Sequence, residues 1–129
     1  MTITHLVFST RNGLVEVPVS EVLYFRAEDK YVTVSALSGD YLSVEPLKYY
    51  EGTFQHLFIR VSRSTLVSRN LELYELRRNH DTVRSTLRLV AHYANGAGRG
   101  MLSIDVSRRH TKAVKTFVAM KSMAEANRV

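Results

Sequence analysis

The chain contains 129 residues, of which 45% are hydrophobic and none is cysteine. This length and composition predict one domain with a buried core, and they exclude disulfides, thiolate catalysis and cysteine-ligated metal sites. No apolar run approaches the roughly 18–20 residues that span a membrane, and no basic segment precedes an apolar one at the N-terminus as in a signal peptide. We therefore expect a soluble, cytoplasmic protein without membrane insertion.

The net charge of +6 is unevenly spread along the chain. Residues 1–56 carry four basic and seven acidic side chains, whereas residues 82–124 carry eight basic side chains against Asp105 alone. A basic second half joined to a slightly acidic first half favours a surface that faces a polyanion. Cations scattered over solvated faces would give the same totals, so the charge needs support from motifs.

The first third of the chain is rich in β-prone runs. Five strands are expected there, at residues 3–9, 14–19, 22–28, 31–37 and 41–45. Asn12-Gly13 favours a tight hairpin between the first two strands, and Pro18 suits a strand end. We expect a meander in which each strand pairs with its neighbour.

Residues 17–34 are the stretch around which the rest of the chain is arranged. Two runs rich in Val, Tyr and Phe flank the charged corner Glu28-Asp29-Lys30, and such runs bounded by turn residues are typical of strands buried on at least one face. The corner therefore lies at one end of a sheet. There it exposes a cation and an aromatic ring, Lys30 and Tyr31, to whatever binds.

A short helix is predicted after the fifth strand. Pro46 can open it because an N–H group at that position would lack a helical partner in any case. The apolar residues of this helix then share one face, namely Leu47, Tyr50 and Phe54. An extended run follows at residues 58–62, and residues 65–67 are expected to turn a corner towards residue 70.

In the second half, strands are predicted at residues 71–77, 83–92 and 102–106, with a turn at residues 79–81 and a glycine-rich loop at residues 93–100. Ser107 then caps a terminal helix. Its inward stripe is narrow and partly polar, so we expect a surface helix docked along one side. The stripe comprises His110, Val114, Phe117, Val118 and Lys121.

Several chemistries find little support in the sequence. The glycines of residues 96–100 do not follow a strand and open a helix, as a phosphate-binding loop requires. The five histidines are far apart and have no carboxylate at metal-ligand spacing. Ser103, Asp105 and His110 are triad residue types without a nucleophile-elbow motif. We therefore predict no enzymatic activity, no metal and no cofactor.

Three cation-bearing segments stand out, each at a turn or at the end of an element. They are Lys30-Tyr31, then Arg60 with Arg63-Ser64, and then Ser107-Arg108-Arg109. Arginine can contact phosphate or guanine through two hydrogen bonds, and hydroxyl groups suit backbone phosphates. N–H groups at a helix start also favour phosphate. Each segment alone is more often a solvated loop, but together they favour nucleic acid.

The chain resembles the LytTR-type DNA-binding domain, the output module of many bacterial response regulators. The resemblance rests on Pro-Val-Ser-Glu-Val-Leu-Tyr-Phe at residues 18–25 with Glu-Asp-Lys-Tyr-Val at 28–32, on Phe-Ile-Arg-Val-Ser-Arg-Ser at 58–64, and on Val-Ser-Arg-Arg-His at 106–110. It covers residues 5–120 of a single domain spanning 1–129. It implies a mainly β, antiparallel sandwich-like fold with a short middle helix and a C-terminal helix, which binds adjacent major grooves of DNA through loops.

The family's DNA-contacting loops correspond here to three pairs of residues. The resemblance places them on Lys30 and Tyr31, on Arg63 with Ser64, and on Arg109 with Arg108, while Arg60 belongs to the motif. The histidine that commonly precedes the motif arginine is Ser62 in this chain. Such domains usually follow a receiver domain, and 129 residues leave no room for one. The chain is then either a standalone regulator or the output part of a longer protein.

We therefore predict a sequence-specific, double-stranded DNA-binding transcription regulator. The resemblance implies repeated promoter sites and a second copy on DNA. An alternative is a protein-interaction module that uses the same fold to sequester another regulator or a membrane partner. A third, RNA or non-specific nucleic-acid binding, would show little preference among duplex sequences. Steep loss of affinity with salt would distinguish a DNA binder from an interaction module.

Overall fold

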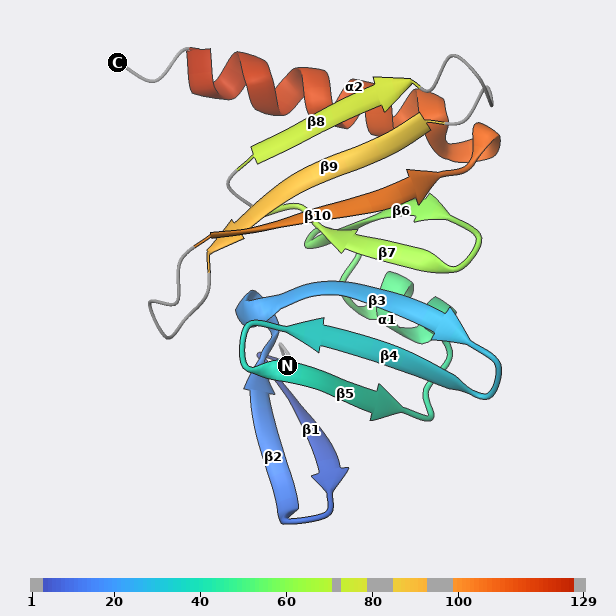
Figure 1. Cartoon of the computed structure of the whole chain (residues 1–129). Coiled ribbons are helices and arrows are strands. Elements are labelled where there is room, and N and C mark those ends of the chain that lie inside the picture. The colour runs from blue at the N-terminus through green and yellow to red at the C-terminus, as the bar shows by residue number, and fades with distance from the viewer. Residues whose placement is uncertain (1–3, 71–72, 79–84, 93–98, 127–129) are drawn as a thin grey trace.

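The structure, a computed structural model, describes residues 4–70, 73–78, 85–92 and 99–126. Within these ranges the chain forms antiparallel strands and two α-helices (Figure 1). In chain order the elements are β1 (His5–Thr10), β2 (Gly13–Pro18), the 3-10 turn η1 (Val19–Glu21), β3 (Val22–Glu28), β4 (Tyr31–Ala36), β5 (Gly39–Ser43), α1 (Leu47–Thr53), β6 (Phe58–Ser62), β7 (Thr65–Ser68), β8 (Leu73–Arg78), β9 (Ser85–His92), β10 (Arg99–Val106) and α2 (Arg108–Ala126). The predicted mainly β fold with a short middle helix and a C-terminal helix is confirmed.

β1 and β2 form a hairpin of their own, in which Thr10 lies opposite Gly13. Gly13 has a φ of +112°, which glycine adopts without steric cost, so the turn predicted from Asn12-Gly13 is confirmed. The chain then passes through η1 into β3, which belongs to a different sheet. The expectation that each strand pairs with its neighbour is therefore wrong between β2 and β3.

The main sheet has five strands in the order β5-β4-β3-β7-β6. β3 lies at its centre, pairing with β4 on one side and with β7 on the other, where Phe25 faces Leu66. The expected corner at residues 65–67 is instead the strand β7, so that prediction is wrong. The polar ends of β7, Thr65 and Ser68, are buried together with its apolar centre, and this removes the alternation that marks a strand in sequence.

Two hydrophobic cores lie on opposite faces of the main sheet. Successive residues of a strand point to opposite faces, and accordingly Phe58 and Leu66 belong to the first core while Ile59 and Val67 belong to the second. The first core is closed by the β1–β2 hairpin and α1. The second is closed by β10 and by α2, whose Val114 is fully buried.

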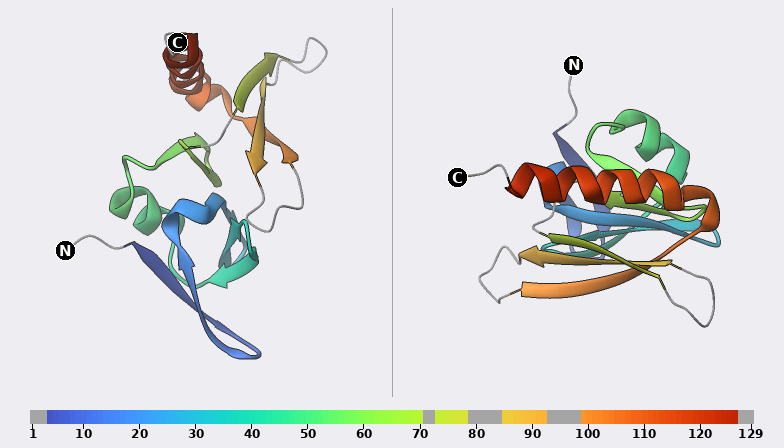
Figure 2. Two further views of the ribbon diagram at one scale, coloured as in Figure 1. Left: turned by 90° about the vertical axis from the view of Figure 1, so that its left-hand side faces the viewer. Right: turned by 90° about the horizontal axis from the view of Figure 1, so that it is seen from above.

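The three-stranded sheet β10-β9-β8 and α2 cover the second core at the end of the molecule opposite the β1–β2 hairpin (Figure 2). Val114 and Phe117 are buried and Val118 packs against them, so the predicted stripe of the terminal helix is confirmed. β10 begins at Arg99, earlier than the expected strand. The turn predicted at residues 79–81 and the glycines at 96 and 98 lie outside the described residues.

Candidate nucleic-acid interface

Three cation-bearing loops lie along one edge of the molecule. They are the β3–β4 turn, the β6–β7 turn and the start of α2, which appear together at the right-hand side of Figure 1. Backbone hydrogen bonds join them: the N–H of Ala27 donates to the carbonyl oxygen of Ser64 at 2.8 Å, and the N–H of Ser107 donates to that of Val61 at 3.0 Å. Segments about forty residues apart in sequence are thus fixed relative to one another. We call this region the loop edge.

The β3–β4 turn presents Lys30 and Tyr31 at the tip of a hairpin. Asp29 adopts a left-handed conformation, with a φ of +48°, which Asp tolerates better than most residues. Lys30 is exposed, and the Tyr31 side chain is 48% exposed. Glu28 accepts a hydrogen bond from the hydroxyl of Thr33 at 3.2 Å. A cation and an aromatic ring are therefore available beside two acidic side chains, as the sequence predicts.

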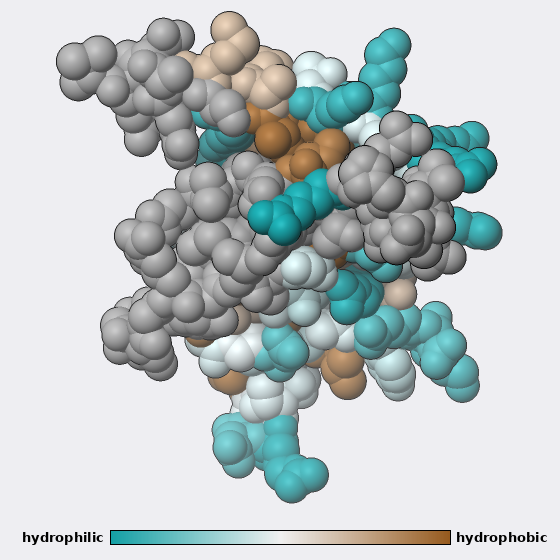
Figure 3. All heavy atoms as spheres, turned by 45° about the horizontal axis from the view of Figure 1, so that its top comes forward, coloured by the Kyte–Doolittle hydropathy of each residue, from teal (hydrophilic) through white to brown (hydrophobic). Residues whose placement is uncertain are grey.

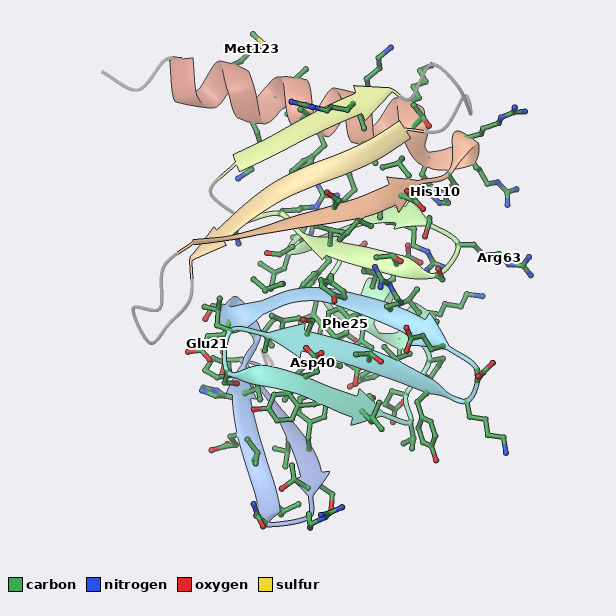
Figure 4. All side chains as sticks on the ribbon, viewed as in Figure 1. Glu21, Phe25, Asp40, Arg63, His110 and Met123 are labelled. Atoms are coloured by element: carbon green, nitrogen blue, oxygen red, sulfur yellow. The ribbon has the colours of Figure 1, made fainter. Side chains whose placement is uncertain are left out.

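The β6–β7 turn carries Arg63 and Ser64, both exposed. Figure 4 shows the Arg63 side chain pointing away from the body of the protein. The turn is ordered from within, because the N–H of Ser64 donates to the Ser62 hydroxyl oxygen at 3.2 Å. Ser62 therefore contributes a local contact at the position where the family commonly has histidine.

The Arg60 side chain hydrogen-bonds the backbone of this turn. Its Nε donates to the carbonyl oxygen of Ser62 at 2.8 Å, and its Nη2 donates to that of Arg63 at 2.6 Å. Its Nη1 donates to Oε1 of Glu51 at 3.2 Å, an ion pair with α1. Three of the five N–H groups of this guanidinium thus bind the protein itself. Sequence reasoning missed Glu51, which no local pattern connects to the turn.

The start of α2 brings two more arginines to the loop edge. Ser107 directly precedes the helix, as predicted for a cap, and its hydroxyl is hydrogen-bonded to Nδ1 of His110 at 2.7 Å. Arg108 and Arg109 are both exposed. Burial lowers the pKa of His110 below its ordinary value, and the positive charges of Arg60 and Arg109 lower it further. This lowered pKa favours the neutral imidazole, so the positive charge here comes mainly from the arginines.

Hydrophilic side chains gather along the same edge in the space-filling view (Figure 3). The predicted residues at the loop edge are brought together as a group, comprising Lys30, Tyr31, Arg60, Arg63, Ser64, Ser107, Arg108 and Arg109. Arg26 lies just behind them, with its guanidinium 5.2 Å from the centre of the Tyr24 ring. Sequence reasoning missed this cation, which the alternation of β3 would have placed on the face opposite Phe25.

Within the described ranges, no group of His, Asp or Glu side chains is arranged to hold a metal ion. In that part of the chain, neither helix combines the length and apolar character needed to cross a membrane. The arrangement thus offers cations, hydroxyl groups and one exposed aromatic ring on an edge. Such an edge can bind a polyanion through both phosphate and base contacts.

Comparison with known proteins agrees with this chemistry. The family model described as the LytTr DNA-binding domain matches residues 12–119. The positive alginate biosynthesis regulatory protein of Pseudomonas aeruginosa is 35% identical over 115 residues, which are 89% of this chain and 43% of that protein. The chain thus spans less than half the length of this relative. A solved LytTr DNA-binding domain from Bacillus cereus has the same fold, with a TM-score of 0.67 at 23% identity over 90% of this chain and 97% of that one.

Proposed function

This chain belongs to the LytTR family of DNA-binding domains, and from this membership we propose that it is a sequence-specific transcription regulator that inserts its loops into the major groove of double-stranded DNA. LytTR domains are output domains of bacterial response regulators, and they are not enzymes. DNA binding follows from the family, whereas the sequence preference and the contacts below are our proposal.

The observation that carries the proposal is the loop edge itself. Two backbone hydrogen bonds, from Ala27 to Ser64 and from Ser107 to Val61, hold three cation-bearing loops side by side. A duplex presents phosphates on both sides of a groove about 12 Å wide, with base edges between them. A row of loops can therefore contact base edges and the flanking phosphates without a recognition helix.

We assign base contacts to three cations of the loop edge, and phosphate contacts to its hydroxyl groups and to Arg108. Arg63 and Arg109 are exposed and can each bind O6 and N7 of guanine, the commonest specific contact in the major groove. Lys30 reaches the same groove as a mobile cation. Phosphates are left to the remaining residues, namely Tyr31, Ser64, Ser107 and Arg108.

Arg60 has a different part in this proposal. Its guanidinium hydrogen-bonds the carbonyl oxygens of Ser62 and Arg63 and pairs with Glu51. A side chain held in this way fixes the shape of the turn from which Arg63 projects. We therefore assign Arg60 mainly to positioning Arg63, although the sequence motif alone suggested a DNA contact.

Two copies are expected to bind neighbouring repeats of a promoter site. The experiment that tests the proposal is selection of bound duplexes from a randomised DNA pool, at low and at near-physiological salt. The expected result is a short repeated motif that is enriched at both salt concentrations. Binding without enrichment that disappears uniformly as salt rises would contradict sequence-specific regulation, because phosphate contacts alone behave in that way. It would favour non-specific nucleic-acid binding, whereas the absence of any duplex binding at low salt would favour the competing hypothesis of a protein-interaction module.

A further inference from the structure

A groove runs along α2 on the side facing α1 and β6. Its volume is about 1090 Å³. One wall is the face of α2 from Arg109 to Lys121, and the other is formed by the end of α1, by β6 and by residues 69–70. α1 lies on this side of the molecule, away from the three-stranded sheet (Figure 2). The groove therefore overlaps the loop edge at Arg60 and Arg109 and extends beyond it along α2.

The lining of the groove has an apolar centre. Ile59 and Phe117 belong to the second core, and on α2 the exposed side chains of Ala113 and Met120 extend this apolar surface towards solvent. Met120 is 65% exposed. An exposed methionine beside an aromatic ring is a feature of surfaces that bind apolar side chains of partner proteins, since methionine is flexible and polarisable.

Cations lie at both ends of this apolar centre. Arg60, Arg109 and Lys112 are at the end next to the loop edge. At the other end, the guanidinium of Arg69 lies 5.5 Å from the centre of the Phe117 ring, and the Lys121 ammonium lies 6.0 Å from it. Glu51 is the acid among the described lining residues, and it is paired with Arg60. The charge of the groove is therefore strongly positive, whereas its centre is apolar.

We propose that this groove docks an acidic amphipathic helix from a partner protein, with apolar side chains against Phe117 and Met120 and carboxylates at the two cationic ends. In this mode of binding, an amphipathic partner helix lies in the groove and contacts it through apolar residues spaced by three and four positions. The proposal goes beyond DNA binding and does not depend on it.

The length of the groove supports a helical segment as the occupant. Its α2 wall extends over thirteen residues, from Arg109 to Lys121, which is about 18 Å for twelve rises of 1.5 Å. A partner helix of about three turns would reach both cationic ends at once, whereas a small ligand would engage one. Duplex DNA is a poor fit, because its phosphates gain nothing from an apolar centre formed by Phe117 and Met120.

The test is a selection from a phage-displayed library of random peptides about 14 residues long, roughly four helical turns, with the whole chain free of DNA as the target. We expect enriched peptides that combine Asp or Glu with apolar residues spaced by three and four. Their affinity is then measured by fluorescence anisotropy for Met120→Asp and for the matched control Met123→Asp. Met123 is on the same helix and equally exposed, at 66%, but it does not line the groove and points away from the sheets (Figure 4).

Met120→Asp should weaken binding at least about tenfold, the change expected when an apolar anchor in a groove is replaced by a like charge. Met123→Asp should leave it within about twofold. Lys112→Glu, in the groove, should likewise weaken binding more than Lys115→Glu, which is on the same helix but outside it. All four positions are exposed, so each variant should fold normally. Circular dichroism checks this.

Three outcomes would overturn the proposal. One is the absence of an enriched acidic, amphipathic class of peptides. Another is an enriched class that binds Met120→Asp and Met123→Asp equally well, which would indicate general attraction to a basic protein. The third is binding of dodecanoate, lost in Met120→Asp, without any enriched peptide, which would make the groove a site for small amphipathic anions.

Discussion

The two cores of this domain differ in composition and in what they support. The first contains an aromatic cluster, in which Phe25 stacks on Tyr50 with ring centres 4.3 Å apart and meets Phe58 edge to face at 4.9 Å. The second is mainly aliphatic, with Val61, Val67 and Val114 fully buried. Only the second core supports α2, the helix that brings arginines to the loop edge and forms a wall of the groove. The first core should therefore determine whether the domain folds, and the second how the binding elements are placed.

The largest expected effect comes from the first core. Phe25→Ala should lower the free energy of unfolding by about 3–5 kcal/mol, because Phe25 is fully buried at the centre of the main sheet and its loss leaves a cavity. Urea unfolding followed by circular dichroism measures this change. Val44→Ala is the matched control, since Val44 is 81% exposed and should change stability by less than about 0.5 kcal/mol. Equal losses for the two variants would contradict the account.

A smaller effect is expected in the second core. Val114→Ala removes two buried methyl groups and should cost about 1–3 kcal/mol. The loss should be concentrated in α2, so amide hydrogen exchange should accelerate there before it does in β3. Lys115→Ala, one residue along on the exposed face, is the control. Equal acceleration of amide hydrogen exchange in α2 and β3 would show that the two cores unfold as one unit. That result would contradict the proposed difference between the cores.

Arg60 offers a third test, on DNA binding. Arg60→Ala removes the hydrogen bonds to the carbonyl oxygens of Ser62 and Arg63 and should weaken binding to the selected duplex about tenfold, or about 1.4 kcal/mol. Arg60→Lys should fail to restore affinity, because an ammonium cannot reproduce the guanidinium geometry. Glu51→Gln should lose less. If lysine restored full affinity, Arg60 would act as a phosphate contact and not through the turn.

The smallest expected effect depends on pH. Because the pKa of His110 is lowered in the folded protein, the unfolded chain binds more protons below its ordinary pKa of 6.5. Stability should therefore fall as the pH drops from about 7.5 to about 5.5, and part of this fall should be absent in His110→Gln. Urea unfolding of both proteins at the two pH values gives the difference. A fall of the same size in both would exclude His110 as a source.

Much of the scaffold could be predicted because its signals are local. The strand–corner–strand pattern around Asp29 and the apolar stripe of α2 both appear in short windows of sequence. The strand β7 could not be predicted, because its buried Thr65 and Ser68 look like loop residues and its pairing with β3 joins segments about forty residues apart. Burial of polar residues and pairing between distant segments produce no periodic hydrophobic pattern in the sequence.

The loop edge shows the same division. Its residues could be named from cation-bearing turns and from family resemblance, but their adjacency depends on the Ala27–Ser64 and Ser107–Val61 hydrogen bonds. Glu51 was missed, since its ion pair with Arg60 is set by packing and not by sequence spacing. The sequence thus predicted which side chains contact DNA, and the structure shows how the loops that carry them are held together.

The most direct test of the account compares Arg63→Ala with Lys30→Ala on the selected duplex and on each of its single-base variants. We predict that Arg63→Ala loses about 1–3 kcal/mol and relaxes preference at one base position. The Lys30→Ala variant should keep its preference at that position and relax it at a different base, because Lys30 contacts the groove from the β3–β4 turn. Unchanged binding for Arg63→Ala, or an equal loss on every sequence, would contradict the claim that the β6–β7 turn reads bases.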